Sequence, residues 1–252
     1  MNLWTHKLRA FAIHLAISLA VAALAALLVF GVWYPYPYRE ISGGRELFLL
    51  IVAVDVVLGP LITFAVYNPA KSRREKRLDF SVIGLIQIAA LVYGLWTVFQ
   101  ARPVHTVFEY DRLRVVHAVD VPPELLPKTP PGITALPVTG PTLLSLRPMT
   151  VEENVEMTIA ALGGVPLSAR PELWQSYEAG RHAVLTAARP AEELPRRFPA
   201  QSAEIARAVA RTARPPEALA YLPVAARKDT FWTALIDRQD ARVLTYLPLD
   251  SF

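Results

Sequence analysis

The sequence contains no cysteine, and only 19% of its 252 residues are charged. Without cysteine the chain has no disulfide framework, no thiol nucleophile and no cysteine-ligated zinc site. The scarcity of charge, together with 53% apolar residues, excludes an intrinsically disordered chain. The apolar residues are concentrated at the start, since residues 1–100 hold 63 of them. The composition therefore indicates a membrane-embedded part joined to an ordinary globular part.

Three apolar segments are long enough to cross a bilayer, whose hydrocarbon core requires roughly 20 helical residues. They run over about 10–33, 47–67 and 80–99, and each is followed within a few residues by proline. The first is longer than the apolar region of a signal peptide, so we interpret it as an uncleaved spanning helix. The predicted organisation is a membrane domain at 1–102 and a second domain at 103–252.

Basic residues are distributed unevenly around the predicted spans. Lys7 and Arg9 precede the first span, whereas the loop at 34–46 carries two basic and two acidic residues. The loop after the second span carries five basic residues: Lys71, Arg73, Arg74, Lys76 and Arg77. Since short cytoplasmic loops are rich in Lys and Arg, we expect a cytoplasmic N-terminus and an extracytoplasmic C-terminal domain. We expect the five residues to set the topology and contact anionic lipid; the alternative is a docking site for a cytoplasmic partner.

Asp55 is the only charged residue inside a predicted span. A carboxylate at the centre of a spanning helix costs about 2.5–3.5 kcal/mol on insertion scales, so it usually faces protein or water. With a rise of about 1.5 Å per residue, Ser18 and Gln87 lie at a similar depth in the other two spans. We expect these three residues to form an intramembrane polar contact among the protein's own helices. The alternative is that Asp55 contacts a polar group on a partner's transmembrane helix.

Residues 101–252 carry 17 basic and 17 acidic side chains, so the predicted second domain presents no net basic field for nucleic acid. Residues rich in Val, Phe and Tyr around Tyr110 predict a β-hairpin over about 104–121. A proline-rich stretch at about 120–141 predicts an extended loop without regular structure. A closing hairpin is predicted near 231–247.

Helical signals lie between these two hairpins. Thr150 and Glu153 form a capping box that opens a helix ending near 163. Further helices are predicted at about 168–188 and 203–213, each bounded by a capping serine or a proline. The predicted fold is thus an α-helical anchor of three transmembrane helices plus an α+β extracytoplasmic domain with β-hairpins at its start and end.

The sequence contains no specific catalytic constellation. It has no glycine-rich phosphate loop, no HExxH and no GxSxG motif. His105 and His117 are expected to lie opposite each other on paired strands, but no third ligand has the spacing of a metal site. We therefore expect packing or surface histidines, no metal, no cofactor and no enzymatic activity.

Six strings together carry a family resemblance: LGPLITF at 58–64, YNPAK at 67–71, IGLIQ at 83–87, YGLWTVFQARP at 93–103, FEYDR at 108–112 and YLPLD at 246–250. In these strings the chain resembles the type IV pilin accessory protein family (the TfpX/TfpZ type). The resemblance covers the membrane part and the first hairpin closely, thins through the proline-rich loop and the helices, and returns at the C-terminus.

The resemblance implies an inner-membrane protein that is accessory to a major type IV pilin. Such proteins influence pilin stability, assembly or surface display in a chaperone-like way, and the resemblance implies no catalytic residues. The main alternative is an enzyme of pilin modification, such as glycosylation. A sensor with a cytoplasmic output is disfavoured, because the predicted cytoplasmic segments are short. The client pilin and the oligomeric state are left open.

Overall fold

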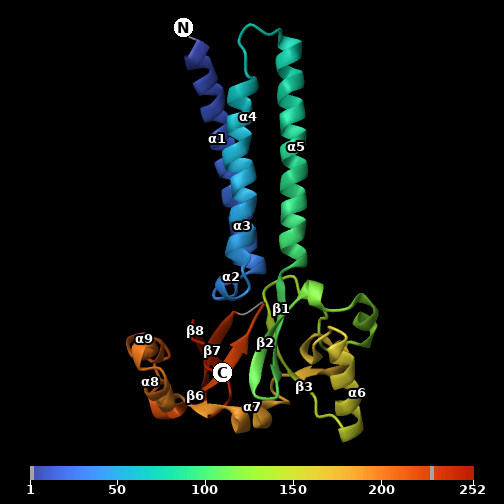
Figure 1. The fold of residues 1–252 in the computed structure, drawn as a ribbon, viewed down its shortest axis with the longest axis vertical. Helices are drawn as coiled ribbons and strands as arrows, with labels where there is room; N and C mark the ends of the chain where they lie inside the picture. The colour runs from blue at the N-terminus through green and yellow to red at the C-terminus, as the bar shows by residue number, and fades with distance from the viewer. Residues whose placement is uncertain (1–2, 228–229) are drawn as a thin grey trace. The chain divides into compact units, whose positions relative to one another are not determined.

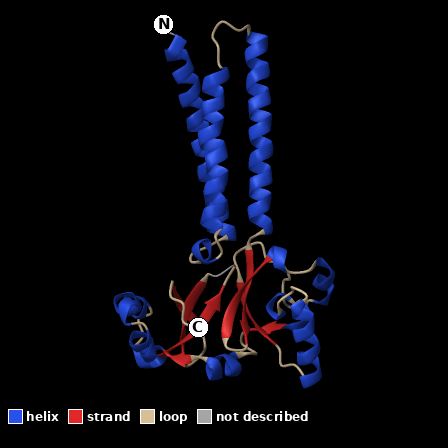
Figure 2. Ribbon diagram, viewed as in Figure 1, coloured by secondary structure: helices blue, strands red, loops and turns tan. Residues whose placement is uncertain are grey.

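The computed structural model describes residues 3–227 and 230–252. Within them the chain forms two units that meet in the sequence at Ala101 and Arg102. The first unit is built from helices, and every described strand belongs to the second (Figure 2). We call them the membrane unit and the α+β unit.

The membrane unit contains three long rods, two of which include a π-helical segment. The rods and the short helix between the first two are α1 (Leu3–Leu28) with η1 (Val29–Trp33), α2 (Tyr38–Ile41), α3 (Gly44–Val52) with η2 (Ala53–Leu58) and α4 (Gly59–Val66), and α5 (Arg73–Gln100). All three rods are long and apolar enough to cross a membrane. The sequence prediction of three apolar helices is therefore confirmed.

Each rod extends beyond the apolar run that predicted it. For example, α5 starts at Arg73 rather than near residue 80. A capping box explains this start, because Ser72 Oγ accepts from the Glu75 N–H and the Glu75 carboxylate accepts from the Ser72 N–H. Hydropathy does not detect such a polar first turn.

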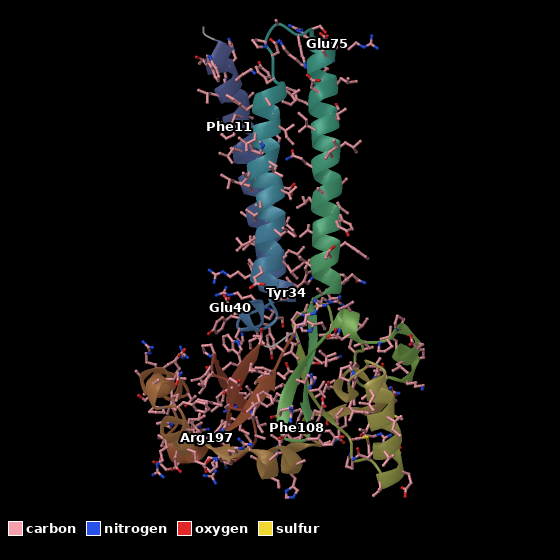
Figure 3. All side chains as sticks on the ribbon, in the orientation of Figure 1. Phe11, Tyr34, Glu40, Glu75, Phe108 and Arg197 are labelled. Atoms are coloured by element: carbon pink, nitrogen blue, oxygen red, sulfur yellow. The ribbon has the colours of Figure 1, made fainter. Side chains whose placement is uncertain are left out.

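The middle rod lies between the other two (Figure 1). Helix α1 packs on α4 and η2, and α5 packs on α3, α4 and η2. At one end of the unit, Tyr34 Oη donates to the Val98 carbonyl oxygen at 3.1 Å. Figure 3 shows Tyr34 at this end and Glu75 at the other. Gly94 allows close packing here, because a Cβ at that position would lie 2.8 Å from Ile51 Cγ1.

The α+β unit is organised around one mixed sheet of eight strands. The strands are β1 (Pro103–Glu109), β2 (Arg112–His117), β3 (Thr142–Leu146), β4 (Trp174–Ser176), β5 (Arg189–Pro190), β6 (Leu219–Ala225), β7 (Phe231–Asp237) and β8 (Val243–Leu247). Their order is β4-β3-β1-β2-β6-β7-β8, with β5 beside β6. The β1–β3 and β2–β6 pairs are parallel, and the other pairs are antiparallel.

Four α-helices and several 3₁₀ turns connect these strands. The helices are α6 (Val151–Leu162), α7 (Arg181–Ala187), α8 (Leu194–Arg197) and α9 (Ser202–Arg211). The 3₁₀ turns are η3 (Ala118–Asp120), η4 (Pro123–Lys128), η5 (Leu167–Ala169), η6 (Pro171–Leu173), η7 (Ala191–Glu193), η8 (Pro199–Gln201) and η9 (Pro216–Ala218). Thr150 and Glu153 cap α6 as the sequence predicts.

Two hydrophobic cores stabilise the α+β unit. In one, Leu194 of α8 and Ile205 of α9 pack with Leu235 of β7. In the other, Trp174 packs with Val107 of β1 and other apolar residues of β2 and β3. Burying a large apolar side chain of this kind contributes about 1.5–3 kcal/mol, so these cores account for much of the unit's stability.

Three sequence predictions are wrong in this unit. The proline-rich loop contains a 3₁₀ turn, η4, because the fixed φ of proline is compatible with such turns. The helix predicted at about 168–188 is helical only at α7; its first half forms η5, η6 and β4, since β4 pairs with the distant β3. His105 and His117 are not opposite each other, because the turn between β1 and β2 has two residues, Tyr110 and Asp111, and this register pairs His105 with Val116.

Candidate functional site

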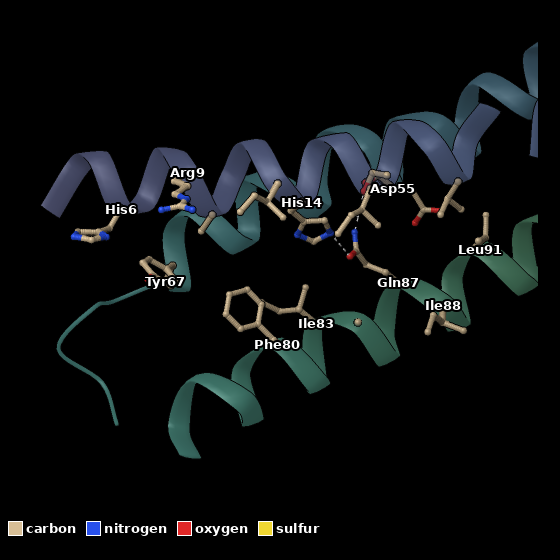
Figure 4. Close-up of a pocket in the computed structure, with 16 residues that line it drawn as sticks. His6, Arg9, His14, Asp55, Tyr67, Phe80, Ile83, Gln87, Ile88 and Leu91 are labelled. Atoms are coloured by element: carbon tan, nitrogen blue, oxygen red, sulfur yellow. Dashed lines mark hydrogen bonds between the residues drawn. The ribbon is translucent and has the colours of Figure 1, made fainter. Parts of the chain in front are cut away.

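The membrane unit contains a groove of about 780 Å³ between α1 and α5 (Figure 4). Its lining residues on α1 recur every three or four positions from His6 to Val21, so they form one face of that helix. On α5 the lining runs in the same way from Phe80 to Leu91. Asp55 of the middle rod also lines it. The groove therefore runs along two helices, with apolar walls and polar residues at its centre.

A chain of hydrogen bonds crosses the centre of the groove and joins all three rods. His14 of α1 lies 2.5 Å from Thr63 Oγ1 through Nδ1, and 2.6 Å from Gln87 Oε1 through Nε2. The amide oxygen of Gln87 only accepts, so His14 Nε2 carries the proton in this arrangement. When the ring is neutral, Nδ1 accepts from the Thr63 hydroxyl. We call His14, Thr63 and Gln87 the polar clasp.

The other end of the Gln87 amide meets the backbone of the middle rod. In the π-helical segment η2, the Gly59 N–H donates to the Val54 carbonyl rather than to that of Asp55. Pro60 has no N–H, so it cannot supply the next helical bond either. Gln87 Nε2 lies 3.5 Å from the Asp55 carbonyl oxygen that these two features leave open. The π segment and Pro60 thus create the acceptor to which Gln87 points.

Gly59 makes room for this amide. A Cβ at Gly59 would lie 1.7 Å from Gln87 Nε2, far inside van der Waals contact. Any larger residue at this position would displace the Gln87 side chain. The close approach of α5 to α4 at the polar clasp therefore depends on glycine.

The Asp55 carboxylate itself does not take part in the polar clasp. Asp55 is only 7% exposed, and its Oδ1 has no hydrogen-bond partner among the described residues. Figure 4 shows Asp55, His14 and Gln87 together at the centre of the groove. A buried acceptor without a donor is costly, typically by about 1–3 kcal/mol, so this group requires an explanation.

The three residues predicted to meet within the membrane all line this groove. Ser18 is buried on α1, Asp55 lies on η2, and Gln87 lies on α5. The connection among the helices passes through His14 and Thr63, which the sequence prediction omits. His14 had a detectable signal, because an ionisable residue inside an apolar span is rare. No sequence signal distinguishes Thr63, because threonine in such a helix commonly bonds to its own backbone.

The five basic residues after the second rod divide into two groups. Lys71 Nζ forms an ion pair with Asp79 Oδ2 at 2.7 Å, and Lys76 Nζ donates to the Pro69 carbonyl at 2.8 Å. Arg73, Arg74 and Arg77 are exposed. The two lysines hold the connection to α5, and the three arginines face outward.

His105 of the α+β unit is a core residue with both ring nitrogens bonded. Nδ1 lies 2.8 Å from Thr142 Oγ1, Nε2 lies 2.9 Å from the Ala135 carbonyl oxygen, and the ring packs edge-on against Trp174. Burial disfavours the charged imidazolium and lowers the pKa of His105 to about 4, although the bond to Ala135 opposes the shift. Among the described residues, no three His, Asp or Glu side chains are grouped to hold a metal ion.

The comparisons with known proteins agree along almost the whole chain. A family model described as Fimbrial assembly protein FimB matches residues 2–43. The fimbrial assembly protein of serogroup I from Dichelobacter nodosus is 36% identical over 242 residues, which cover 95% of this chain and 94% of that protein. The serogroup E1 protein of the same organism is 34% identical over 242 residues, which again cover 95% of this chain and 94% of that protein. No solved structure matches the chain. The chain belongs to the family of fimbrial assembly proteins.

Proposed function

We propose that the protein is a non-enzymatic, chaperone-like accessory of type IV pilus assembly in the bacterial inner membrane. It acts on the pilin before the pilin enters the pilus, on its stability, assembly or surface display. The observation that carries this proposal is the groove between α1 and α5, which the protein's own three helices leave unfilled. It is supported by the two relatives from Dichelobacter nodosus, which are fimbrial assembly proteins.

The proposed orientation places the N-terminus in the cytoplasm and the α+β unit in the periplasm. It is supported by the basic residues at the start of α1 and at the start of α5. The exposed arginines, Arg73, Arg74 and Arg77, then face the anionic headgroups of the cytoplasmic leaflet. The resemblance to pilin accessory proteins supports the same compartment.

In this proposal the protein contacts a pilin in two places. An unassembled pilin has one apolar N-terminal helix in the bilayer and a globular head outside it, and the membrane unit holds the helix. Helix α6 supports a contact with the head, because it exposes an apolar stripe of Val151, Val155, Ile159 and Leu162, each between 56% and 84% exposed. Stripes of this kind on soluble domains mark interaction surfaces.

A deletion strain tests the proposed function. We expect pilin abundance or the number of surface pili to fall in the strain, and to return when the wild-type chain is supplied. Asp55→Ala should restore display only in part. Normal pilin abundance and normal display in the deletion strain would reject the accessory role. An unchanged pilin mass in the deletion strain is also expected, and a smaller mass would favour an enzyme of pilin glycosylation instead.

A further inference from the structure

We propose that the groove between α1 and α5 binds one transmembrane helix of the pilin, and that this helix carries a hydrogen-bond donor at the level of Asp55. The inference rests on the proposed function and assigns to it a site, a kind of occupant and a residue that selects the occupant. Asp55 is then the residue that recognises the bound helix, and the polar clasp positions Asp55.

The shape of the groove favours a helix as the occupant. Its lining on α1 spans residues 6–21, about 22 Å at 1.5 Å per residue, and its lining on α5 spans about 16 Å. The two stripes are connected by the middle rod, on which both outer helices pack. A helix laid in the groove would contact α1 and α5 at once and complete a four-helix arrangement. Ile13, Ile17 and Ile88 supply the apolar walls for it.

The chemistry of the groove requires a donor on that helix. His14 bonds to Thr63 and to Gln87, and Gln87 bonds to the Asp55 carbonyl oxygen, so the polar clasp is complete without the Asp55 carboxylate. Asp55 Oδ1 remains buried and unpartnered in the part of the chain that the structure covers. An incoming hydroxyl, amide or amine at this depth would supply the missing bond. Because a hydrogen bond to a buried acceptor is strong in a medium of low dielectric, this contact would discriminate between helices.

Two other occupants fit these observations less well. A lipid acyl chain fills an apolar groove but provides no donor for a carboxylate. A second copy of this chain also offers none at this level, because the outward residues beside Ser18 and Gln87 are apolar: Leu19, Leu85 and Ile86, each at least half exposed. A partner with a polar group in its own span supplies both the shape and the donor.

Photocrosslinking in native membranes tests the site with a matched pair of positions. Ile88 lines the groove and Ile86 does not, yet both side chains are 62% exposed on α5. A photoreactive amino acid at either position would be activated in cells that express the full chain and the pilin. We expect Ile88 to give a product that maps to the apolar helix of the pilin, and Ile86 to give none. Equal products at both positions, lipid adducts alone, or a product with a second copy of this chain would overturn the proposal.

Substitution of Asp55 tests the selecting residue. Asp55→Leu should lower the pilin product from Ile88 by about tenfold or more, the effect expected when a hydrogen bond to a charged group is lost. Val57→Leu, at an exposed position of the same π segment, should leave it unchanged. If Asp55→Leu reduces the amount of chain in the membrane, Asp55→Asn retains the size and one acceptor oxygen, and should give an intermediate yield. An undiminished product from both Asp55 variants would overturn the role of Asp55.

The two proposals fail in different ways. A deletion strain that loses pilin display, combined with crosslinks that avoid the groove, rejects the groove and leaves the accessory role standing. A deletion strain with normal pilin abundance and display rejects the accessory role itself.

Discussion

Two histidines, one in each unit, have nearly the same hydrogen bonds in different surroundings. His14 lies between Thr63 and the Gln87 amide oxygen, and His105 lies between Thr142 and the Ala135 carbonyl oxygen. In both, Nε2 faces an oxygen that only accepts, so Nδ1 of the neutral ring accepts from a threonine hydroxyl. His105, however, packs against Trp174 inside a closed core, whereas His14 lines a groove of about 780 Å³.

This contrast distinguishes a structural polar group from a functional one in this protein. Both histidines are hydrogen-bonded within their own chain, so a hydrogen-bonded histidine alone indicates no site. What differs is the neighbour: beside His14, Asp55 Oδ1 is buried without a partner among the described residues. Asp55 Oδ1, rather than the histidine, is therefore the group that indicates a ligand site.

Removal of the core histidine should have the largest effect on stability. His105→Ala leaves a cavity beside Trp174 and unpairs Thr142 and the Ala135 carbonyl, so we expect a loss of about 3–5 kcal/mol in the free energy of unfolding of the α+β unit. Hydrogen exchange of β1 amides in the full chain, solubilised in detergent, measures the change. His14→Ala is the matched variant, and it should leave β1 exchange unchanged. Unaltered β1 protection in His105→Ala would contradict the assignment of His105 to the core.

Acid should destabilise the α+β unit through the same residue. The folded-state pKa of His105, about 4, is below its ordinary value of 6.5, so the unfolded chain binds more protons between these pH values. Stability contributed by the neutral ring is present above pH 6.5 and is lost as pH falls toward 4, by about 3 kcal/mol in all. Urea unfolding at several pH values measures the slope. His105→Gln should flatten it, and an equally steep slope in that variant would assign the effect to other groups.

Gly59→Ala should disrupt the polar clasp with an intermediate effect. The added Cβ displaces the Gln87 amide and weakens its bonds to His14 and to the Asp55 carbonyl. Hydrogen bonds within membrane bundles contribute about 0.6–1.7 kcal/mol each, so we expect a loss of about 1–2 kcal/mol, measured by unfolding of the helices in denaturing detergent. Gly84→Ala is the control, because a Cβ there meets nothing within 4 Å. Equal stability of the two variants would show that the Gln87 contacts contribute little.

The smallest effects are expected for the two threonines that bond to the histidines. Thr142→Val and Thr63→Val each remove one hydroxyl donor while retaining the side-chain volume. We expect a loss of about 1 kcal/mol for Thr142→Val and about 0.6 kcal/mol for Thr63→Val. Urea unfolding of the α+β unit measures the loss in Thr142→Val, and unfolding of the helices in denaturing detergent measures the loss in Thr63→Val. A larger loss of unfolding free energy for Thr63→Val than for Thr142→Val would contradict the expectation that the hydroxyl bond in the α+β unit is the stronger one.

The sequence predicts the membrane unit better than the α+β unit, for a physical reason. A spanning helix must bury about 20 residues in lipid and satisfy its backbone within itself, so hydropathy alone identifies it. The strand β4 depends on pairing with β3, about 30 residues away, and on the burial of Trp174. Local signals favoured a helix there, and these non-local contacts override them.

The candidate site is also predicted only in part. Depth arithmetic along the spans places Ser18, Asp55 and Gln87 at one level, and all three line the groove. It does not predict that Gln87 meets the Asp55 backbone, because that contact depends on the π segment and on the bond from Gly59 to Val54. Nor does it predict that Asp55 Oδ1 has no hydrogen-bond partner among the residues that the structure describes. These features arise from how the three rods pack.

Disulfide crosslinking to the pilin tests the central claim most directly, and the absence of natural cysteine makes the chain suited to it. A single cysteine would be placed at Ile17, which lines the groove, or at Leu19, which does not. Each would be paired in native membranes with cysteines scanned along the apolar helix of the pilin. We expect disulfides from Ile17→Cys that recur every three to four pilin positions and disappear in Asp55→Leu, with none from Leu19→Cys. Equal yields from both positions, or no periodicity along the pilin helix, would contradict it.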